Sequence, residues 1–189
     1  MTAPPPFARP PERIVGERVV LRRNRVEDGE AIARAVGASL EHLEPWMPWA
    51  TPEAATAEAQ RGRIVDGTRG WDEGTDFVYV VLTADERTLL GTVGLHRRIG
   101  PGGIEIGYWI HVDHAGRGYG TATVRALTEV ALALPDVGRV EIHCDEANAP
   151  SQAIPRRLGY RLDRIEVDGI SAPGEVGRSM IWVLERQRS

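Results

Sequence analysis

A glycine-rich segment lies between two strongly patterned parts of the chain and limits how the chain can fold. Residues 116–120 read Gly-Arg-Gly-Tyr-Gly; an apolar, β-rich run precedes them at 104–112, and an amphipathic helical pattern follows at 122–134. Residues 139–145 then read as another strand. A strand, a helix and a second strand in this order return the chain in its original direction, which favours a parallel β–α–β unit.

The other predicted strands surround this unit in antiparallel order. Alternating apolar residues predict seven strands in all, at residues 18–23, 76–82, 89–98, 103–112, 139–145, 161–167 and 179–185. Helical patterns occur at residues 26–36, 53–65, 122–134 and 151–158. The sequence therefore predicts an α/β (α+β) fold, with a mixed, mostly antiparallel sheet of about seven strands, one parallel pair and flanking helices. We expect a single domain over residues 14–189, after a flexible, proline-rich leader at 1–13.

The glycine segment predicts a binding site for a phosphorylated ligand. Glycines allow backbone N–H groups to converge, and the start of the following helix adds the positive end of its dipole. The chain contains no lysine, which a Walker A loop requires, and Thr123 stands where a dinucleotide fingerprint needs its third glycine. The ligand is therefore expected to be nucleotide-like, but not ATP, GTP or NAD.

Composition excludes several other classes of protein. The 189 residues fit one domain, and no apolar stretch approaches the roughly 20 residues of a membrane span, so we expect a cytoplasmic protein without a membrane partner. A net charge of -4 argues against direct binding of nucleic acid. The single cysteine, Cys144, excludes an internal disulfide, and His111 and His114 have no metal-ligand pattern around them, so no metal is expected.

Three sequence blocks, in this order, resemble the GNAT superfamily of N-acyltransferases. Residues 42–49, His-Leu-Glu-Pro-Trp-Met-Pro-Trp, are similar to the branch of the RimJ/RimL ribosomal-protein N-terminal acetyltransferases. The glycine segment, preceded by Glu-Ile-Gly-Tyr-Trp-Ile at 105–110, looks like the acyl-CoA loop of that superfamily. The third block, Asn-Ala-Pro-Ser at 148–151 followed by Arg-Arg-Leu-Gly-Tyr at 156–160, resembles its second CoA-contacting helix. The resemblance implies a GNAT fold.

The same resemblance implies acetyl-CoA as co-substrate and an amine as acceptor. The residues expected to contact acetyl-CoA are Ile110, His111, Val112, Arg117, Gly118, Tyr119, Gly120, Thr121, Asn148 and Ser151. Those expected to line the acceptor pocket are Trp46, Met47, Trp49 and Tyr108. Two positions depart from the superfamily pattern. Ala115 replaces a usual glutamine or arginine, so the backbone amides would carry the diphosphate, and Pro155 replaces a tyrosine that often protonates the leaving thiolate.

Acyl transfer to an amine requires a base for the amine and an acid for the thiolate. Glu105 is the candidate base, although strand alternation would also allow it to lie on a solvated face. Ser151 is the candidate acid; the alternative is that it caps a helix, and the alternative for Asn148 is an Asx cap. Tyr160 is expected in the core. Deprotonating the acceptor at pH 7 costs roughly 1.4 kcal/mol for an α-amine and 4.6 for lysine, which favours an α-amine.

We therefore predict an N-acetyltransferase that moves an acetyl group to a primary amine by direct transfer in a ternary complex. A protein or peptide N-terminal α-amine is the leading acceptor. A small amine such as a polyamine, amino acid or aminoglycoside is the second, and an acidic patch of Glu41, Glu44 and Glu53 would favour a cationic one. A catalytically inactive CoA-binding sensor is the alternative from another class. The resemblance also suggests a homodimer.

Overall fold

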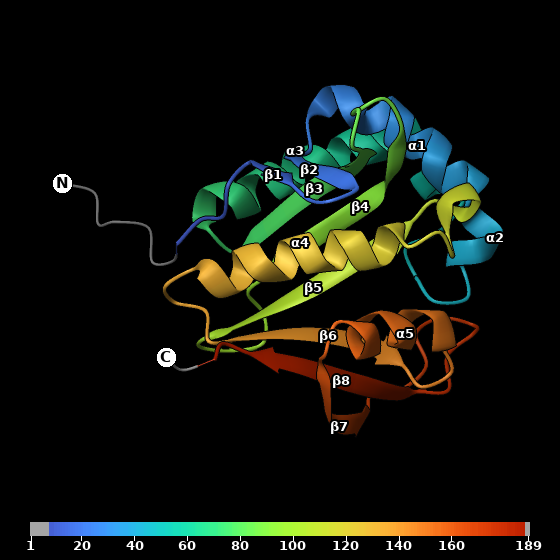
Figure 1. Ribbon diagram of the computed structural model, residues 1–189. Helices are drawn as coiled ribbons and strands as arrows, with labels where there is room; N and C mark the ends of the chain where they lie inside the picture. Colours follow the sequence, from blue (N-terminus) through green and yellow to red (C-terminus); the bar gives the residue numbers. More distant parts are fainter. Residues whose placement is uncertain (1–7, 188–189) are drawn as a thin grey trace.

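One mixed sheet organises the protein, as the computed structural model shows for residues 8–187, the part of the chain that the structure describes (Figure 1). Its eight strands within these residues have the order β1-β2-β3-β4-β5-β6-β8-β7. The strands are β1 (Arg13–Val15), β2 (Val19–Arg23), β3 (Asp76–Thr83), β4 (Leu89–His96), β5 (Gly103–Ile110), β6 (Arg139–Asp145), β7 (Arg161–Val167) and β8 (Arg178–Glu185). All neighbouring pairs are antiparallel except β5 and β6. The predicted fold class is confirmed.

The helices form two layers on opposite faces of the sheet (Figure 1). They are α1 (Gly29–Ala38), α2 (Leu40–Leu43), α3 (Ala57–Glu73), α4 (Tyr119–Ala133) and α5 (Ala149–Arg157), with short 3-10 turns at Val26–Asp28, Glu53–Ala55 and Val112–His114. Helix α4 packs along β5 and β4, and α5 lies against β6, whereas α1 and α3 pack on β4 and β3 from the other side. Within residues 8–187, no helix is both long and apolar enough to cross a bilayer.

Residues 8–13, the described part of the predicted leader, contact the domain in the structure. Residues 13–15 form the short strand β1, which pairs with β2 and accounts for the eighth strand. Upstream of it, the carbonyl oxygen of Pro11 accepts a hydrogen bond from the Tyr79 hydroxyl at 2.9 Å, and that of Ala8 accepts one from Arg97 at 2.9 Å. From residue 8 onward this segment therefore packs on the domain; residues 1–7 of the predicted leader lie outside the described residues.

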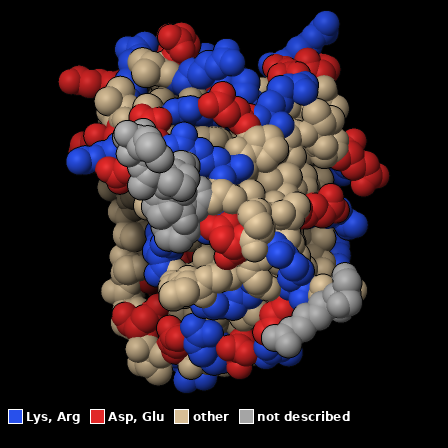
Figure 2. All heavy atoms as spheres, turned by 90° about the vertical axis from the view of Figure 1, so that its left-hand side faces the viewer, with Lys and Arg blue, Asp and Glu red and all other residues tan. Residues whose placement is uncertain are grey.

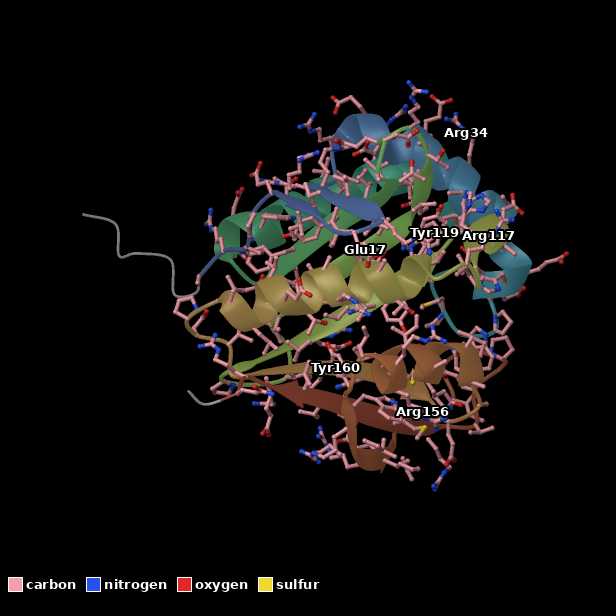
Figure 3. All side chains as sticks on the ribbon, in the orientation of Figure 1. Glu17, Arg34, Arg117, Tyr119, Arg156 and Tyr160 are labelled. Atoms are coloured by element: carbon pink, nitrogen blue, oxygen red, sulfur yellow. The ribbon has the colours of Figure 1, made fainter. Side chains whose placement is uncertain are left out.

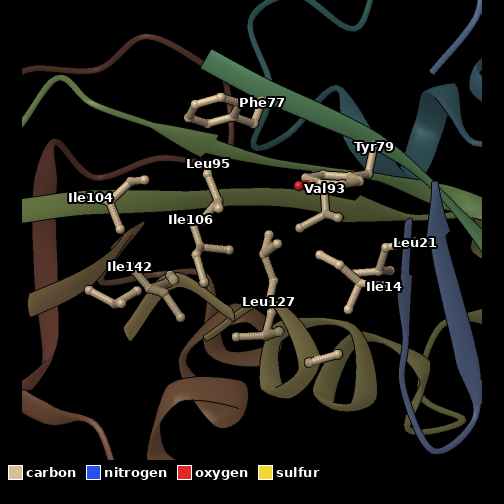
Figure 4. Close-up of a cluster of buried hydrophobic side chains, with 14 of the residues drawn as sticks. Ile14, Leu21, Phe77, Tyr79, Val93, Leu95, Ile104, Ile106, Leu127 and Ile142 are labelled. Atoms are coloured by element: carbon tan, nitrogen blue, oxygen red, sulfur yellow. The ribbon is translucent and has the colours of Figure 1, made fainter. Parts of the chain in front are cut away.

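The core follows the side-chain alternation of the central strands. On the α4 face, Ile104 and Ile106 of β5 pack with Leu127 of α4, and all three are nearly inaccessible to solvent (Figure 4). On the other face, Val80 and Trp109 pack with residues of α1 and α3 in a second apolar cluster. Burial of both sheet faces fixes the register of β5, because a slip by one residue would exchange its two sets of side chains.

Charged side chains are interspersed on the face of the molecule shown in Figure 2. Basic and acidic groups alternate there over short distances, with surface of other residues between them. This face therefore offers no continuous basic surface of the kind that a nucleic-acid backbone requires.

The parallel pair is very short. Only Gly103, Ile104 and Glu105 of β5 pair with β6, opposite residues 139–141, whereas β6 pairs with β8 over seven residues. Beyond Glu105 the two strands diverge, as Figure 1 shows. The later part of β5, up to Ile110, thus keeps β4 on one edge and has no β6 partner on the other.

One carboxylate holds the carboxyl end of β6 to the segment that enters β8. Asp145 Oδ1 accepts the backbone N–H of Ala147 at 2.8 Å, and Oδ2 accepts those of Val176 and Gly177 at 3.0 Å and of Arg178 at 3.2 Å. Burial raises the pKa of Asp145, but these backbone donors outweigh it and the net pKa is lowered. The α5 helix begins immediately after this anchor.

The Asp145→Ala substitution is expected to lower the free energy of unfolding. It removes the acceptor of four backbone N–H groups, of which that of Gly177 is buried, a loss of roughly 1–3 kcal/mol. Because the folded-state pKa of Asp145 is lowered, its contribution is complete above the ordinary aspartate value of about 3.9 and is lost as the pH falls through the folded-state pKa. Urea unfolding at pH 7 and pH 3 measures this difference; an equal gap between wild type and variant at both pH values would contradict it.

Candidate active site

The glycine segment forms a cradle at the beginning of α4. Gly116 and Gly118 have φ angles of +72° and +84°, a left-handed conformation that glycine adopts with little strain, and Gly118 is the N-cap residue of α4. The backbone N–H groups of the first helical turn have no partner within the helix, so they can bind an anion there. Figure 3 shows Arg117 and Tyr119 at this end of α4.

A cavity of about 320 Å³ opens from this cradle, and we name it the loop cavity. Its lining residues come from the glycine segment, from α5, from the end of β5 and from the turn after α2: His42, Leu43, Trp46, Met47, Tyr108, Trp109, Ile110, Ala115, Gly116, Gly118, Gly120, Thr121, Asn148, Pro150, Ser151, Ala153, Ile154 and Arg157. The cavity therefore lies where β5 and β6 diverge.

The predicted cofactor-contacting residues fall into two groups. Six of the ten line the loop cavity: Ile110, Gly118, Gly120, Thr121, Asn148 and Ser151. The other four belong to the surrounding backbone but are not part of the lining: His111, Val112, Arg117 and Tyr119. The Val112 N–H donates to Ser39 Oγ at 3.1 Å, and the His111 ring stands 5.4 Å from that of His114, so these residues shape the loop. Their assignments as contacts stay predictions.

Arg157 brings a positive charge to the cradle. Its guanidinium Nη1 donates to Thr121 Oγ1 at 3.0 Å, and both residues line the loop cavity. Sequence reasoning left the diphosphate to the backbone amides alone, since Ala115 supplies no contact. The structure adds this side chain from α5: the resemblance implied that the helix contacts the cofactor, but it did not single out Arg157. Amide donors and a guanidinium together suit a diphosphate group.

Ser151 and Tyr108 meet in the loop cavity across the gap between β5 and α5. Ser151 Oγ lies 3.0 Å from Tyr108 Oη. The helix cap is Asn148, whose Oδ1 accepts the Ser151 N–H at 3.1 Å, so the Asx-cap alternative describes Asn148 and the serine hydroxyl is free of capping. Burial raises the pKa of Tyr108, although the Ser151 hydrogen bond opposes this, so the phenol stays protonated at neutral pH. The pair is a neutral proton donor.

A second cavity, of about 460 Å³, lies on the other face of the sheet. We name it the helix-side cavity, because α1 and α3 form its roof. It is lined by Asn24, Ile32, Val36, Met47, Trp49, Gln60, Arg63, Ile64, Val78, Thr92, Val93, Gly94, His96, Arg98, Gly107, Tyr108 and Trp109. Three of the predicted acceptor residues, Met47, Trp49 and Tyr108, are therefore found here, whereas Trp46 lines only the loop cavity.

The two cavities share a wall. Met47, Tyr108 and Trp109 line both of them, so groups bound on opposite faces of the sheet would meet at this wall. Trp109, to which the sequence assigned no role, is only 7% exposed, and its ring centroid lies 6.2 Å from that of Trp49. A buried tryptophan in the core would give the same alternating strand pattern, so the sequence alone does not indicate that Trp109 lies in a cavity wall.

Glu105 is buried beside the helix-side cavity and is not among its lining residues. The Arg98 side chain holds both carboxylate oxygens, with Nε 2.7 Å from Oε2 and Nη2 2.5 Å from Oε1. Burial raises the pKa of Glu105, but the Arg98 hydrogen bond and nearby positive charge outweigh burial and lower it overall. The alternative of a solvated strand face is wrong for this residue, and its role as base stays a prediction.

The chain belongs to the GNAT acetyltransferases. The family description "Acetyltransferase (GNAT) domain" matches residues 18–161, which include the cradle, the shared wall and the start of α5. The predicted GNAT membership is confirmed, and an acetyl-CoA-dependent acyltransferase is the class of enzyme that this fold and site define.

Similar proteins agree with this family. A Bacillus subtilis (strain 168) protein named "Putative ribosomal N-acetyltransferase YdaF" is 27% identical over 85% of this chain and 87% of its own length. Mycobacterium smegmatis RimJ, solved in complex with CoA-disulfide, has the same fold with a TM-score of 0.85 and 20% identity, over 94% of this chain and 90% of that one. A Salmonella typhimurium acetyltransferase described as modifying the N-terminal serine of ribosomal protein L7/L12 has a TM-score of 0.79 and 19% identity, over 92% and 99%.

The Gly118→Asp substitution is expected to abolish acetyl-CoA binding, because it places a carboxylate and a side chain in the anion cradle. Gly169→Asp is the matched control: its φ of +85° is close to the +84° of Gly118, and open space surrounds it away from the cradle. Isothermal titration with acetyl-CoA compares the two variants. Equal affinities for both would show that the cradle does not hold the diphosphate.

Proposed function

We propose that the protein transfers the acetyl group of acetyl-CoA directly to the N-terminal α-amine of a protein or peptide. The observation that carries this proposal is the wall shared by the two cavities, which lets a donor and an acceptor approach one reaction point from opposite faces of the sheet. Acetyl-CoA supplies the activated acetyl thioester. The chain supplies the cradle, the apolar wall and the polar groups beside it.

The charge of the helix-side cavity favours this acceptor over a cationic small amine. Arg63 lines it and supplies positive charge, whereas Arg98, which also lines it, is paired with the Glu105 carboxylate. None of its described lining residues is an aspartate or glutamate. The expected acidic patch is not there: Glu41, Glu44 and Glu53 are exposed and line neither cavity. A polyamine or aminoglycoside would meet positive charge without a carboxylate partner.

A peptide terminus also demands less of the base. Deprotonation at pH 7 costs about 3 kcal/mol less for an α-amine than for a lysine side chain. The Salmonella typhimurium acetyltransferase described above modifies an N-terminal serine, which is an acceptor of this chemical class. This likeness supports a protein terminus as acceptor here.

In our proposal the Ser151 hydroxyl protonates the leaving thiolate, and the Tyr108 hydroxyl is hydrogen-bonded to Ser151. The Ser151–Tyr108 hydrogen bond of 3.0 Å gives a donor in the loop cavity although Pro155 occupies the position of the family's common tyrosine. This donor is a reason to favour an active enzyme over a CoA-binding sensor that lacks turnover.

Acceptor choice is expected to depend on Arg63. The Arg63 guanidinium lies 5.1 Å from the centre of the Trp49 ring at the cavity wall. Arg63→Glu should lower kcat/KM for peptides with acidic residues behind the terminus by roughly tenfold, since reversing a charge near the substrate costs on the order of 1 kcal/mol or more, and should improve relative use of polyamines. Arg69→Glu, on the exposed side of the same helix, is the charge-matched control. Thiol release with a panel of peptides, polyamines and aminoglycosides measures this.

Should wild-type enzyme release thiol with the polyamines and not with peptides, the acceptor class proposed here is wrong. Absence of release with every amine, combined with tight acetyl-CoA binding, would favour the sensor.

Ser151 and Tyr108 are expected to act as one unit. Ser151→Ala and Tyr108→Phe should each lower kcat, by roughly 100-fold at most, while acetyl-CoA affinity changes little. The double variant should be no slower than the slower single variant, since either change removes the same donor. Steady-state rates for the four proteins form the double-mutant cycle, and multiplicative losses would show that the two hydroxyls act independently.

A further inference from the structure

A histidine and an aspartate form a hydrogen-bonded pair at the helix-side cavity, and neither residue has a role in the transfer chemistry proposed above. Asp76 of β3 and His96 of β4 are cross-strand neighbours, and His96 Nδ1 lies 2.6 Å from Asp76 Oδ1. The His96 hydrogen bond is the largest cause of a lowered pKa for Asp76, so the carboxyl group is ionised at neutral pH and can only accept. The proton of a neutral imidazole therefore sits on Nδ1, and Nε2 carries the lone pair.

Two glycines make room for the ring. Gly94 of β4 and Gly107 of β5 are register partners, and a Cβ on Gly94 would lie 2.7 Å from His96 Nε2. A Cβ on Gly107 would lie 3.3 Å from the same atom. The imidazole thus lies across both backbones, and any side chain on Gly94 would displace it. The ring extends from His96 over Gly94 and Gly107. The next residue of β5 on this face of the sheet is Trp109, which belongs to the shared wall.

The ring is also accessible from the cavity. His96 lines the helix-side cavity together with Met47, Tyr108 and Trp109, and its side chain keeps 19% of its surface exposed. An oriented imidazole with its lone pair in a cavity next to the reaction point has the arrangement that a general base requires.

We propose that His96, oriented by Asp76, takes the proton from the acceptor amine; this rests on the proposed acetyl transfer. In that step a bond forms between the amine nitrogen and the acetyl carbon, and the carbon–sulfur bond breaks with its electron pair on sulfur. The proton lost by nitrogen goes to His96 Nε2, directly or through one water, and the sulfur receives a proton from the Ser151 hydroxyl. His96 then releases its proton to solvent and Ser151 regains one from solvent through Tyr108, so the cycle consumes and releases no net proton. Asp76 is a positioning residue: it selects the tautomer and stabilises the imidazolium.

The charged groups around His96 are compatible with this role. Asp76 faces it from β3, Arg98 from the connection after β4 and Glu105 from β5, while His143 of β6 lies close enough to influence Glu105. Arg98 and Glu105 hold each other through two hydrogen bonds, so their charges largely cancel beside the imidazole. A carboxylate paired in this way is a weak base, whereas the Nε2 lone pair has no partner of this kind.

The test compares His96→Gln with His143→Gln. Glutamine removes the imidazole ring in both. His143, paired with Glu141 at 2.8 Å, lines neither cavity, so it controls for loss of a histidine–carboxylate pair. For each protein, kcat/KM is measured against pH with whichever amine the wild-type enzyme acetylates, and acetyl-CoA affinity is measured by titration. A wrong acceptor class therefore does not affect this test.

His96→Gln is expected to lower kcat/KM by roughly 10²- to 10⁴-fold and to remove the limb on which the rate rises with pH. Acetyl-CoA affinity should stay within about twofold, and His143→Gln should keep both rate and limb. Asp76→Asn should also slow turnover without weakening acetyl-CoA binding, because an amide can donate to Nδ1 and favour the wrong tautomer. Added imidazole should partly restore the rate of His96→Ala, which a merely structural role would not allow.

Glu105→Gln is the competing variant. A wild-type rate and an unchanged limb in His96→Gln, together with loss of the limb in Glu105→Gln, would make Glu105 the base and overturn the assignment of His96. Retention of the limb in both variants would also overturn it, since the titrating group would then be the substrate amine itself.

Discussion

The arrangement of the site follows from the early end of the parallel pairing between β5 and β6. Three residue pairs join these strands, and then β5 continues with one edge lacking a strand partner. Backbone N–H and C=O groups along such an edge need partners from water, side chains or a ligand. The loop cavity opens at this edge, so an extended chain with amide groups can be bound there as a further strand would be.

Because of the same divergence, the end of β5 borders a cavity on each face of the sheet. Side chains of β5 alternate between the faces, and at the end of the strand Tyr108 and Trp109 point to opposite layers while lining both cavities. The turn after α2 adds Met47 to this wall, and the Ser39 hydroxyl ties α1 and α2 to the backbone of Val112 at 3.1 Å. The acceptor-side helices and the loop that follows β5 are therefore held to one another through this hydrogen bond as well as through packing.

Local signals predicted much of this fold. Alternation identified seven of the eight described strands, the Gly100–Gly103 turn fixed the β4–β5 hairpin, and the order strand, loop, helix, strand gave the one parallel pair. The three-residue strand β1 was missed because so short a segment carries no periodicity. Resemblance, not periodicity, gave the family.

The site was harder to predict, because its contacts join residues that are distant in sequence. Arg157 reaches Thr121 from a helix 36 residues away, and Asp76 reaches His96 through a strand register that alternation alone does not set. Glu105 illustrates a different difficulty. The sequence identified the residue, but it did not predict the ion pair with Arg98 from the opposite side of the β4–β5 hairpin. Residue types that form a site are thus visible in the sequence, whereas tautomers, ion pairs and shared walls follow only from the packing of the sheet.

The state of Cys144 bears on whether an acyl-enzyme could form. This cysteine lies beside Ser151, although it does not line the loop cavity, and it is the one thiol that could act as nucleophile in a two-step route. Burial raises its pKa to about 11, so at neutral pH almost all of it is thiol, and the thiolate is the reactive form. Its side chain is also only slightly exposed, at 8%. A covalent route would require ionisation of the Cys144 thiol, which burial keeps neutral. Direct transfer would need only the gap between β5 and β6, which the fold already provides. The burial of Cys144 therefore supports a ternary complex as the simpler use of this site.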